Sequence, residues 1–415
     1  MKIAIIGGGS AYAPGLLQAF AAEAAHFGDA ELALMDVAAP ELDVVHALGR
    51  RLLEGTDLRL SATTDRTRAL DGADLVLTTF RQGGMEARAL DERVPLAFGV
   101  IGQETIGPGG FFFAMRTLPV MRAIADDLRR WAPGATVVNY TNPTQIVAEA
   151  MARYTDVPCI AICDQTDDDR VHLAAALRLP PAAIELESVG LNHATWSTVC
   201  RIEDEDGVAR LLAEADAVRA RPDVGARVKR QIALTEAYGR VPNGYLPYYY
   251  DREACVADAR AAPRTRAEAI LEELPAMYRH FEAQARAEAP RLTQGRGGSV
   301  FGDFAVRVLR ALVTGEETRL TLNVRNDGAL PDLEAERIVE VPCRVVGGRV
   351  TAEPQGRFAR EQLGLLRMLA DYQAAAADAI WAGDPAAMER ALAANPLVVS
   401  LTLARDLLRA RAAAG

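Results

Sequence analysis

The chain has 415 residues, of which 50% are hydrophobic and 25% charged, and its formal net charge is −10 at pH 7. These values are typical of a folded globular protein, and the length exceeds what one hydrophobic core usually fills. The negative charge and the lack of a run of Lys and Arg argue against a nucleic-acid partner. Apolar stretches such as residues 1–6 are too short to span a membrane, and the N-terminus has a strand pattern in place of a secretion signal. We therefore expect a cytoplasmic protein with no membrane partner.

From residue 1 to residue 165, short apolar runs alternate with helical patterns, which is typical of a parallel sheet with crossover helices. Strands are predicted over Lys2–Ile6, Glu31–Asp36, Leu58–Ala62, Asp74–Thr79, Thr136–Tyr140 and Pro158–Cys163. Helices are predicted over Gly15–Ala25, Glu41–Leu53 and Arg116–Trp131. This order predicts an α/β protein with an N-terminal Rossmann-like, doubly wound sheet, in which ligands bind at the carboxyl ends of the strands.

The pattern changes after His193. Predicted strands over Thr195–Ile202 and Arg319–Asn326 stand among long helices such as Thr265–Arg286 and Phe358–Trp381, which predicts a C-terminal α+β domain. We divide the chain into residues 1–190 and 191–415. No Ser- and Gly-rich linker marks the boundary, so we expect the two domains to pack closely.

A glycine-rich loop, GGGSAY, follows the first predicted strand and precedes a helix. It departs from the usual G-x-G-x-x-G pattern, but its position predicts that Gly7, Gly9 and Ser10 hold a dinucleotide. Asp36 ends the second strand, where an acidic side chain can bind the ribose hydroxyls. Its charge would repel a 2′-phosphate and therefore predicts NAD and not NADP. The alternative is a tight strand-to-helix turn with an unrelated aspartate.

Cys163 and His193 are candidates for a metal site. The five cysteines are odd in number and scattered, so we expect reduced thiols. Taken separately, Cys163 could be a small buried hydrophobic residue and His193 a core histidine. A catalytic metal, however, needs few protein ligands and open positions for substrate oxygens, and one thiolate with one imidazole fits that need.

The segment NGYLPYYY contains Tyr245, Tyr248, Tyr249 and Tyr250. For most of these tyrosines we expect an aromatic domain interface. A tyrosine can act as a base only if a nearby cation lowers its pKa from about 10 toward neutral. The tyrosine and metal hypotheses are therefore coupled.

Several segments in chain order, spread over nearly the whole sequence, resemble one known family. They are FRQGGMEARALDERVPLAFGVIGQETIGPGGFFFAMRTLPVM, NYTNPT, CD, GLNH, NGYLPYYY, RGGSV and NDGALPDL. They resemble the motifs of glycoside hydrolase family 4, whose members are glycosidases dependent on NAD and a divalent metal, and most closely the 6-phospho-β-glucosidases. The block from GGMEARALDE to GQETIGPGG is specific, whereas the glycine loop is not. This family is an exception to the two-carboxylate rule for glycosidases.

The resemblance implies that Cys163 and His193 hold the metal, usually Mn²⁺, and that Tyr245 is the catalytic base. NAD would oxidise carbon 3 of the sugar, which makes the proton on carbon 2 acidic. The metal would stabilise the enolate as a Lewis acid while Tyr245 removes that proton. Elimination of the glycosidic oxygen, addition of water and re-reduction would complete a net hydrolysis with the cofactor unchanged.

Further residues fall at family positions. Arg88 of GGMEAR and Asn142 of NYTNP match substrate contacts, and Glu104 of GQET matches a position important for activity. Arg266 falls where the family places an arginine on the substrate phosphate, and its alternative is a solvated helix arginine. The implied partner is a small phosphorylated glycoside, bound by a homodimer or homotetramer, with substrate binding, catalysis and oligomerisation in residues 191–415.

Position 164 departs from the 6-phospho-β-glucosidase pattern. That motif commonly continues Cys-Asn, whereas Cys163 is followed here by Asp164, which resembles the proton donor of 6-phospho-α-glucosidases. Hydrolysis of 6-phospho-β-glucosides is therefore the expected function, and a 6-phospho-α-glucosidase or other hexosidase of the family is the alternative. We interpret Asp167, Asp168 and Asp169 as a solvated helix start. Because such a cluster is unfavourable beside a phosphate, a nonphosphorylated hexoside also stays open.

The main alternative from another class is an NAD-dependent 2-hydroxy-acid dehydrogenase, which shares the nucleotide-binding fold. It would need a histidine relay, and only His193 lies in a suitable motif, without an evident companion aspartate. A nucleotide-sensing binding protein without turnover is a further alternative, against which the presence of the metal and base positions weighs.

Overall fold

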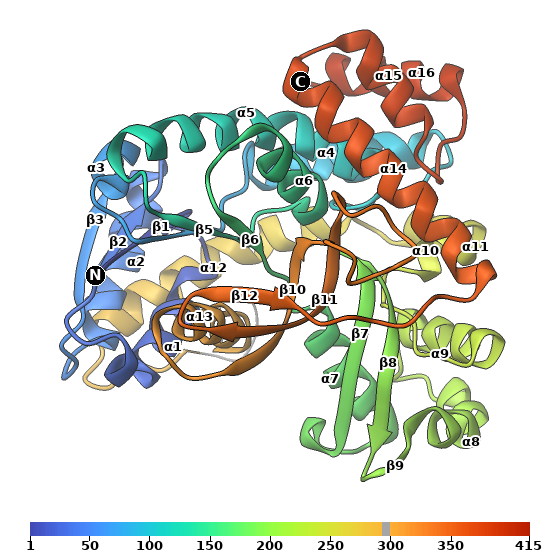
Figure 1. Cartoon of the computed structure of the whole chain (residues 1–415), viewed down its shortest axis with the longest axis horizontal. Helices are drawn as coiled ribbons and strands as arrows, with labels where there is room; N and C mark the ends of the chain where they lie inside the picture. Colours follow the sequence, from blue (N-terminus) through green and yellow to red (C-terminus); the bar gives the residue numbers. More distant parts are fainter. Residues whose placement is uncertain (293–298) are drawn as a thin grey trace.

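The computed structural model describes residues 1–292 and 299–415, and the described residues form a 12-stranded sheet with helices on both faces (Figure 1). Residues 296–298 of the RGGSV segment lie outside the described residues. Along the sheet the strand order is β3-β2-β1-β4-β5-β6-β10-β11-β7-β8-β9, with β12 paired to β11. The strands are β1 (Lys2–Ile6), β2 (Glu31–Met35), β3 (Arg59–Thr63), β4 (Leu75–Thr78), β5 (Thr136–Asn139), β6 (Cys159–Ala161), β7 (Ile184–Leu191), β8 (Ala194–Ile202), β9 (Glu205–Asp206), β10 (Thr318–Arg325), β11 (Ile338–Val346) and β12 (Arg349–Ala352).

The N-terminal half confirms the predicted doubly wound sheet. Strands β3, β2, β1, β4, β5 and β6 are parallel neighbours in that order, which is the strand order of a dinucleotide-binding fold. Their sequences are nearly continuous apolar runs, as in KIAII of β1, because helices cover both faces of such a sheet. The strand order reverses between β1 and β4, so the carboxyl ends of these strands border a crevice.

Helices connect the strands and cover the sheet. They are α1 (Ala13–Ala22), α2 (Ala39–Leu52), α3 (Arg66–Leu70), α4 (Gly84–Ala97), α5 (Gly107–Trp131), α6 (Thr144–Tyr154), α7 (Gln165–Leu177), α8 (Gly207–Ala220), α9 (Ala226–Tyr238), α10 (Pro247–Tyr250), α11 (Arg252–Ala261), α12 (Arg266–Arg286), α13 (Ser299–Val313), α14 (Arg360–Ala382), α15 (Pro385–Ala393) and α16 (Leu401–Ala413).

Helix α5 begins well before the predicted start at Arg116, so that boundary was wrong. The glycines of its first turn look like loop residues in the sequence, but they are needed for close packing. A Cβ on Gly109 would meet the carbonyl oxygen of Gln103, and one on Gly110 would lie 2.5 Å from Thr105. The preceding loop therefore packs directly against the helix backbone.

The second half has the predicted α+β character, but its strands extend the first sheet. Strand β10 pairs antiparallel with β6 through Asn323 and Ala161, and β11 pairs antiparallel with β10 and β7. A hairpin of β7 and β8 follows, and β9 pairs with β8 at the edge of the sheet. One mixed sheet thus runs through both parts of the chain, while the division into residues 1–190 and 191–415 stays a prediction.

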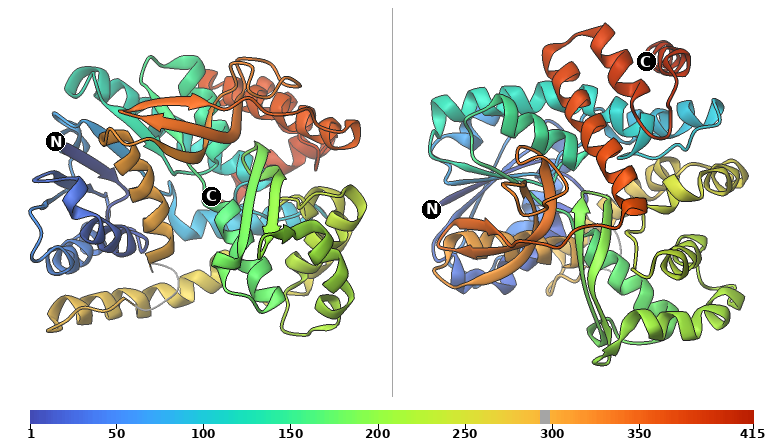
Figure 2. Two further views of the ribbon diagram at one scale, coloured as in Figure 1. Left: turned by 60° about the horizontal axis from the view of Figure 1, so that its bottom comes forward. Right: turned by 45° about the vertical axis from the view of Figure 1, so that its right-hand side comes forward.

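Helices from the second half pack on the first. Helix α12 lies against α2 and α4, α13 against α1, and α14 against α5 and α6, an arrangement that Figure 2 shows from two further sides. The main hydrophobic core includes Ile3 of β1 and Leu322 of β10, both fully buried. The two parts share one core, as the absence of a linker predicted.

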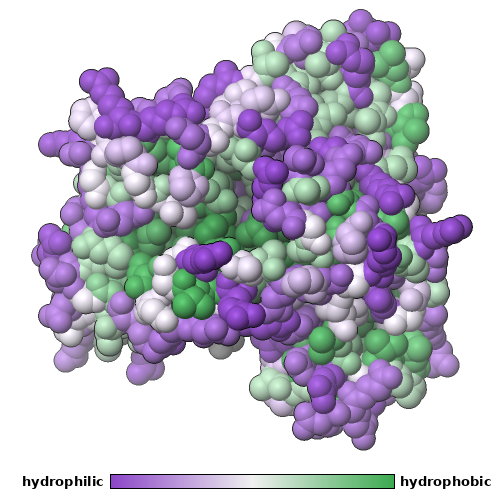
Figure 3. Space-filling model, viewed as in Figure 1, coloured by the Kyte–Doolittle hydropathy of each residue, from purple (hydrophilic) through white to green (hydrophobic). Residues whose placement is uncertain are grey.

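Hydrophilic side chains cover much of the face seen in Figure 3, and hydrophobic ones show between them across its middle. Among the described residues, no helix is both long enough and apolar enough to cross a membrane.

Candidate active site

A cavity of about 1360 Å³ opens where β1, β2 and β4 end. Its volume exceeds that of most small-molecule sites and suits a dinucleotide together with a sugar. Arg88 and Arg266 are not among its lining residues. The other predicted site residues all line it: Gly7, Gly9, Ser10, Asp36, Glu104, Asn142, Cys163, Asp164, His193 and Tyr245.

The glycine loop between β1 and α1 has a backbone that only glycine fits. Gly7 has a φ of +99°, and a Cβ there would lie 2.7 Å from the backbone of Thr79 and Phe80. The loop leads directly into α1, whose N-terminus favours an anionic group such as a pyrophosphate. This close approach, at the crevice between β1 and β4, fits a dinucleotide.

Asp36 joins the glycine loop to the end of β2. The Gly9 N–H donates to its Oδ2 at 3.0 Å, and the Ala38 N–H donates to its Oδ1 at 3.1 Å. The carboxylate is therefore fixed where a dinucleotide ribose would lie. Tyr278 of α12 donates its hydroxyl hydrogen to the Gly9 carbonyl at 2.8 Å. The second half of the chain thus stabilises the glycine loop. No local sequence pattern predicted this contact between Tyr278 and Gly9.

The candidate metal ligands come together. Cys163 follows β6, His193 lies at the turn between β7 and β8, and Sγ of Cys163 lies 3.5 Å from Nε2 of His193. The Thr105 hydroxyl lies 3.0 Å from Nδ1 of His193 and donates its own hydrogen to Gln103. In the tautomer with the ring proton on Nδ1, the imidazole donates to the Thr105 hydroxyl and the lone pair of Nε2 faces the Cys163 thiol.

This pair has the properties of an incomplete metal site. Burial lowers the pKa of His193 to about 4, so the imidazole is neutral, and burial raises the pKa of the Cys163 thiol. A bound cation would ionise such a thiol. Over residues 1–292 and 299–415, no group of three or more His, Cys, Asp or Glu side chains is arranged to hold a metal. A metal held by this pair keeps open positions for substrate oxygens.

Tyr245 stacks on the imidazole of His193, with ring centroids 3.9 Å apart and planes 5° apart. Burial raises the pKa of Tyr245, Glu104 and Cys163 raise it further, and Arg227 opposes them. Such a phenol keeps its proton at neutral pH unless a cation lies nearby. Tyr249 and Tyr250 are partly buried and pack against the main core, and their place at a domain interface stays a prediction.

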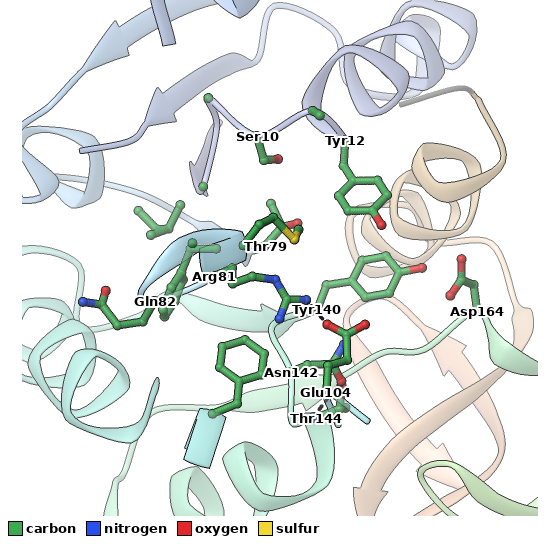
Figure 4. Close-up of a pocket in the computed structure, with 18 of the residues that line it drawn as sticks. Ser10, Tyr12, Thr79, Arg81, Gln82, Glu104, Tyr140, Asn142, Thr144 and Asp164 are labelled. Carbon is green, nitrogen blue, oxygen red and sulfur yellow. Dashed lines mark hydrogen bonds and ion pairs between the residues drawn. The ribbon is translucent and has the colours of Figure 1, made fainter. Parts of the chain in front are cut away.

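Asp164 directly follows Cys163 and faces a pair of tyrosines. Burial raises the pKa of Asp164 to about 6, and the neighbouring Tyr140 hydroxyl opposes this rise. Figure 4 shows the hydroxyl of Tyr140 directed toward Asp164, with Tyr12 above it. A carboxyl group with this pKa can exchange its proton near neutral pH and serve as a general acid or base.

Glu104 joins two arginines beside the cavity. It forms ion pairs with Arg81 and with Nη1 of Arg88, the latter at 3.0 Å. Arg88 also donates from Nε to Glu92 at 2.7 Å and is almost fully buried. It is thus held between two carboxylates, whereas Arg81 lines the cavity and lies over the ring of Phe113. Arg81 was missed, although it stands in the same FRQGG segment.

Asn142 and Arg266 are placed very differently. Asn142 lines the cavity, and its Oδ1 accepts hydrogen bonds from the backbone and hydroxyl of Thr144 at the start of α6. Arg266 begins α12 with an exposed side chain. Arg266 does not line the cavity, and its contact with a substrate phosphate stays a prediction.

The acidic start of α7 is only partly solvated, so our interpretation of Asp167, Asp168 and Asp169 needs correction. Asp168 forms an ion pair of 2.8 Å with Arg227 of α9. Asp169 is 2% exposed and accepts a hydrogen bond from the backbone of Gly244. Its position in the first turns of a helix gave no sign that a loop from elsewhere covers it.

Two family models match the chain in succession. The model for family 4 glycosyl hydrolases matches residues 2–178, and that for the C-terminal domain of the same family matches residues 188–398. The chain belongs to glycosyl hydrolase family 4.

Relatives of this family 4 chain span both anomeric specificities. It is 31% identical over 424 residues to a probable 6-phospho-beta-glucosidase of Bacillus subtilis, covering 98% of this chain and 95% of that protein. It is 27% identical over 435 residues to a 6-phospho-alpha-glucosidase of Leptotrichia buccalis, covering 98% and 96%. Its fold is similar to that of the 6-phospho-beta glucosidase from Thermotoga maritima solved with manganese, NAD+ and glucose-6-phosphate. That structure is 25% identical in sequence to this chain, with a TM-score of 0.87. The match covers 100% of this chain and 98% of the solved one.

Proposed function

We propose that this chain hydrolyses 6-phospho-β-glucosides with NAD and a divalent metal, Mn²⁺ being the first candidate. One observation carries the proposal: the Cys163 thiol, the His193 imidazole and the Tyr245 ring meet at the cavity that also contains the glycine loop and Asp36. Membership of family 4 and the 6-phospho-β-glucosidase relative support the substrate class.

The residues present fit both groups. Gly7, Gly9, Ser10 and Asp36 would hold NAD at the end of β1, and Cys163 and His193 would hold the metal. When bound, NAD supplies reversible oxidation at carbon 3 of the sugar, and the metal supplies a Lewis acid for the oxygens on carbons 2 and 3.

The chain's own side chains then handle protons and orientation. Tyr245, ionised beside the bound cation, would accept the proton of carbon 2 on its phenolate oxygen; its ring stacks on His193 at the candidate cation site. Asn142 and the Arg81–Glu104 pair line the cavity and would orient the sugar hydroxyls. The shared cavity keeps the acidified carbon close to the base, and this positioning lowers the barrier to proton transfer.

A 6-phospho-α-glucosidase is the second candidate, and Asp164 favours it. Its pKa, raised by burial to about 6, suits a proton donor to the leaving oxygen. The phospho-α-glucosidase relative supports the same alternative. A 2-hydroxy-acid dehydrogenase has less support, because Nδ1 of His193 faces the Thr105 hydroxyl and not a carboxylate.

We also infer a cytoplasmic location and assembly as a homodimer or homotetramer. The five cysteines are all free thiols, which suits a reducing compartment. Size-exclusion chromatography with light scattering would measure the number of subunits.

A panel of aryl glucosides tests the function. The reduced protein is incubated with NAD and Mn²⁺ in deuterated water with α- and β-glucosides, each with and without a 6-phosphate. We expect release from the 6-phospho-β-glucoside, with deuterium at carbon 2 of the product and no net NADH. Release without this label would contradict the mechanism. Preference for the α-anomer would select the second candidate, and accumulation of NADH would indicate a dehydrogenase.

A further inference from the structure

Helix α7 carries a carboxylate that the proposed chemistry does not use. Asp169 is 2% exposed, and α7 begins directly after Cys163 and Asp164. A buried carboxylate is costly unless hydrogen bonds and charges compensate it. The partners of Asp169 therefore indicate what it does.

Both oxygens of Asp169 have partners. Oδ2 accepts a hydrogen bond of 2.9 Å from the backbone N–H of Gly244, the residue before Tyr245. Oδ1 accepts one of 2.9 Å from Nε2 of Gln165, one turn earlier on α7. The partly exposed guanidinium of Arg227 supplies a positive charge nearby. The carboxylate thus connects α7 to the loop that carries Tyr245.

The contact between Asp169 and Gly244 is tight. A Cβ added to Gly244 would lie 2.5 Å from Oδ1 of Asp169 and 3.4 Å from Cδ of Arg227. Gly244 does not have a positive φ, so backbone strain does not require glycine here. A larger residue is disfavoured because its Cβ would lack space. The loop and the carboxylate therefore fix one another.

The remaining backbone groups of the loop are held by the loop itself and by β8. Oδ1 of Asn243 accepts from the Tyr245 N–H at 3.0 Å, and Nδ2 of Asn243 donates to the Thr195 hydroxyl at 3.1 Å. The Leu246 N–H donates to the Asn243 carbonyl. Among the described residues, the bond to Asp169 is the one hydrogen bond that connects the N–H groups of Gly244, Tyr245 and Leu246 to α7.

We propose that Asp169 is a positioning residue for Tyr245. It sets the Asn243–Gly244 peptide, directly before Tyr245, relative to α7, the helix that begins two residues after the candidate metal ligand Cys163. This inference rests on the proposed function, in which Tyr245 removes a proton beside the metal. A catalytic group works only within a narrow geometry, and a displacement of about 1 Å costs roughly 100-fold in rate.

The test compares Asp169→Leu, which replaces both acceptor oxygens by methyl groups, with Asp169→Asn, whose carbonyl can still accept from Gly244. Three quantities are measured for the metal- and NAD-loaded protein: kcat, KM, and the rate of deuterium exchange at carbon 2 of the hexose 6-phosphate product. That exchange needs no cleavage of the glycosidic bond. NAD affinity is measured separately by fluorescence titration. The control is Asp206→Ala, which removes a carboxylate that likewise accepts from backbone N–H groups, at the start of α8.

For Asp169→Leu we expect kcat and the exchange rate to fall together by roughly 10- to 100-fold, with KM and NAD affinity within about threefold of the wild type. Asp169→Asn should recover most of both rates, and Asp206→Ala should change neither. If Asp169→Leu does not fold, Gly244→Ala displaces the same contact from the other side and should give the same pattern.

The inference is overturned if the Leu and Ala variants keep kcat and exchange within about twofold, or if Asn fails to recover what Leu loses. A wild type that releases product without carbon 2 exchange would instead overturn the proposed function and this inference with it. The two failures are therefore distinguishable in the wild-type measurement alone.

Discussion

The thiol of Cys163 lies 3.5 Å from Nε2 of His193, although thirty residues separate them in the chain. Cys163 stands just beyond the carboxyl end of β6, in the parallel part of the sheet. His193 occupies the turn between the antiparallel strands β7 and β8 with a φ of +62°, a left-handed conformation that is uncommon outside glycine. The candidate metal site is therefore built where the two parts of the sheet meet.

Metal removal is the first prediction. Chelation should abolish turnover and added Mn²⁺ should restore it, because the proposed function places a metal on Cys163 and His193. In Cys163→Ser, a hydroxyl replaces the thiol, and the Mn²⁺ dissociation constant measured by calorimetry should rise by roughly tenfold or more. Cys200→Ser, which changes a thiol that does not line the cavity, is the control. Equal Mn²⁺ affinity in both variants would remove Cys163 from the site.

Tyr245→Phe should lose activity without losing the cofactor. Phenylalanine keeps the stack on His193 but has no oxygen to accept a proton, so kcat should fall by roughly 100- to 10,000-fold. NAD affinity, measured by fluorescence titration, should stay unchanged. Tyr248→Phe removes a neighbouring hydroxyl and should keep turnover. Retained turnover in Tyr245→Phe would assign the base to another residue.

Gly7→Ala should weaken NAD binding. Alanine at φ +99° is strained, and its Cβ would lie 2.7 Å from the backbone of Thr79 and Phe80. A cost of about 1–3 kcal/mol predicts a dissociation constant for NAD raised between about 5- and 150-fold. Gly28→Ala is the control: Gly28 also has a positive φ but has open space around it, so this variant has the backbone strain without the close contact. If both variants bind NAD like the wild type, the loop does not hold the dinucleotide.

Glu149→Gln should change how stability depends on pH. Burial raises the pKa of Glu149, and Oε1 accepts from the Ile338 N–H at 2.9 Å. Because the folded state binds this proton more tightly than the unfolded state, Glu149 lowers the free energy of unfolding as pH rises from its unfolded pKa through its raised folded pKa.

The loss amounts to about 1.4 kcal/mol for each unit by which the pKa is raised. The glutamine variant lacks this loss, so its melting temperature minus that of the wild type should increase from pH 4 upward and level off above the folded pKa. Calorimetric melting at several pH values measures this difference. A difference that is constant with pH would show that Glu149 titrates normally in the folded protein.

The sequence by itself determined the parallel strands, the glycine loop and the family. Apolar runs such as KIAII, punctuated by glycine, predict buried strands because both are local properties of the chain. The motifs CD, GLNH and NGYLPYYY, read through the family resemblance, indicated the candidate ligands Cys163 and His193 and the candidate base Tyr245. The predicted start of α5 was wrong because Gly109 and Gly110 are needed for close contact with a loop, and they meet that loop only in the folded protein.

Only the tertiary structure decided how these residues meet. It extended the parallel sheet with antiparallel strands through the pairing of Ala161 with Asn323, and it left Arg266 exposed and away from the cavity. It also buried Asp169 under the loop of Gly244, where the sequence predicted a solvated helix start. Proximity between distant segments arises from packing of the whole chain, and no periodicity within one segment encodes which other segment will cover it.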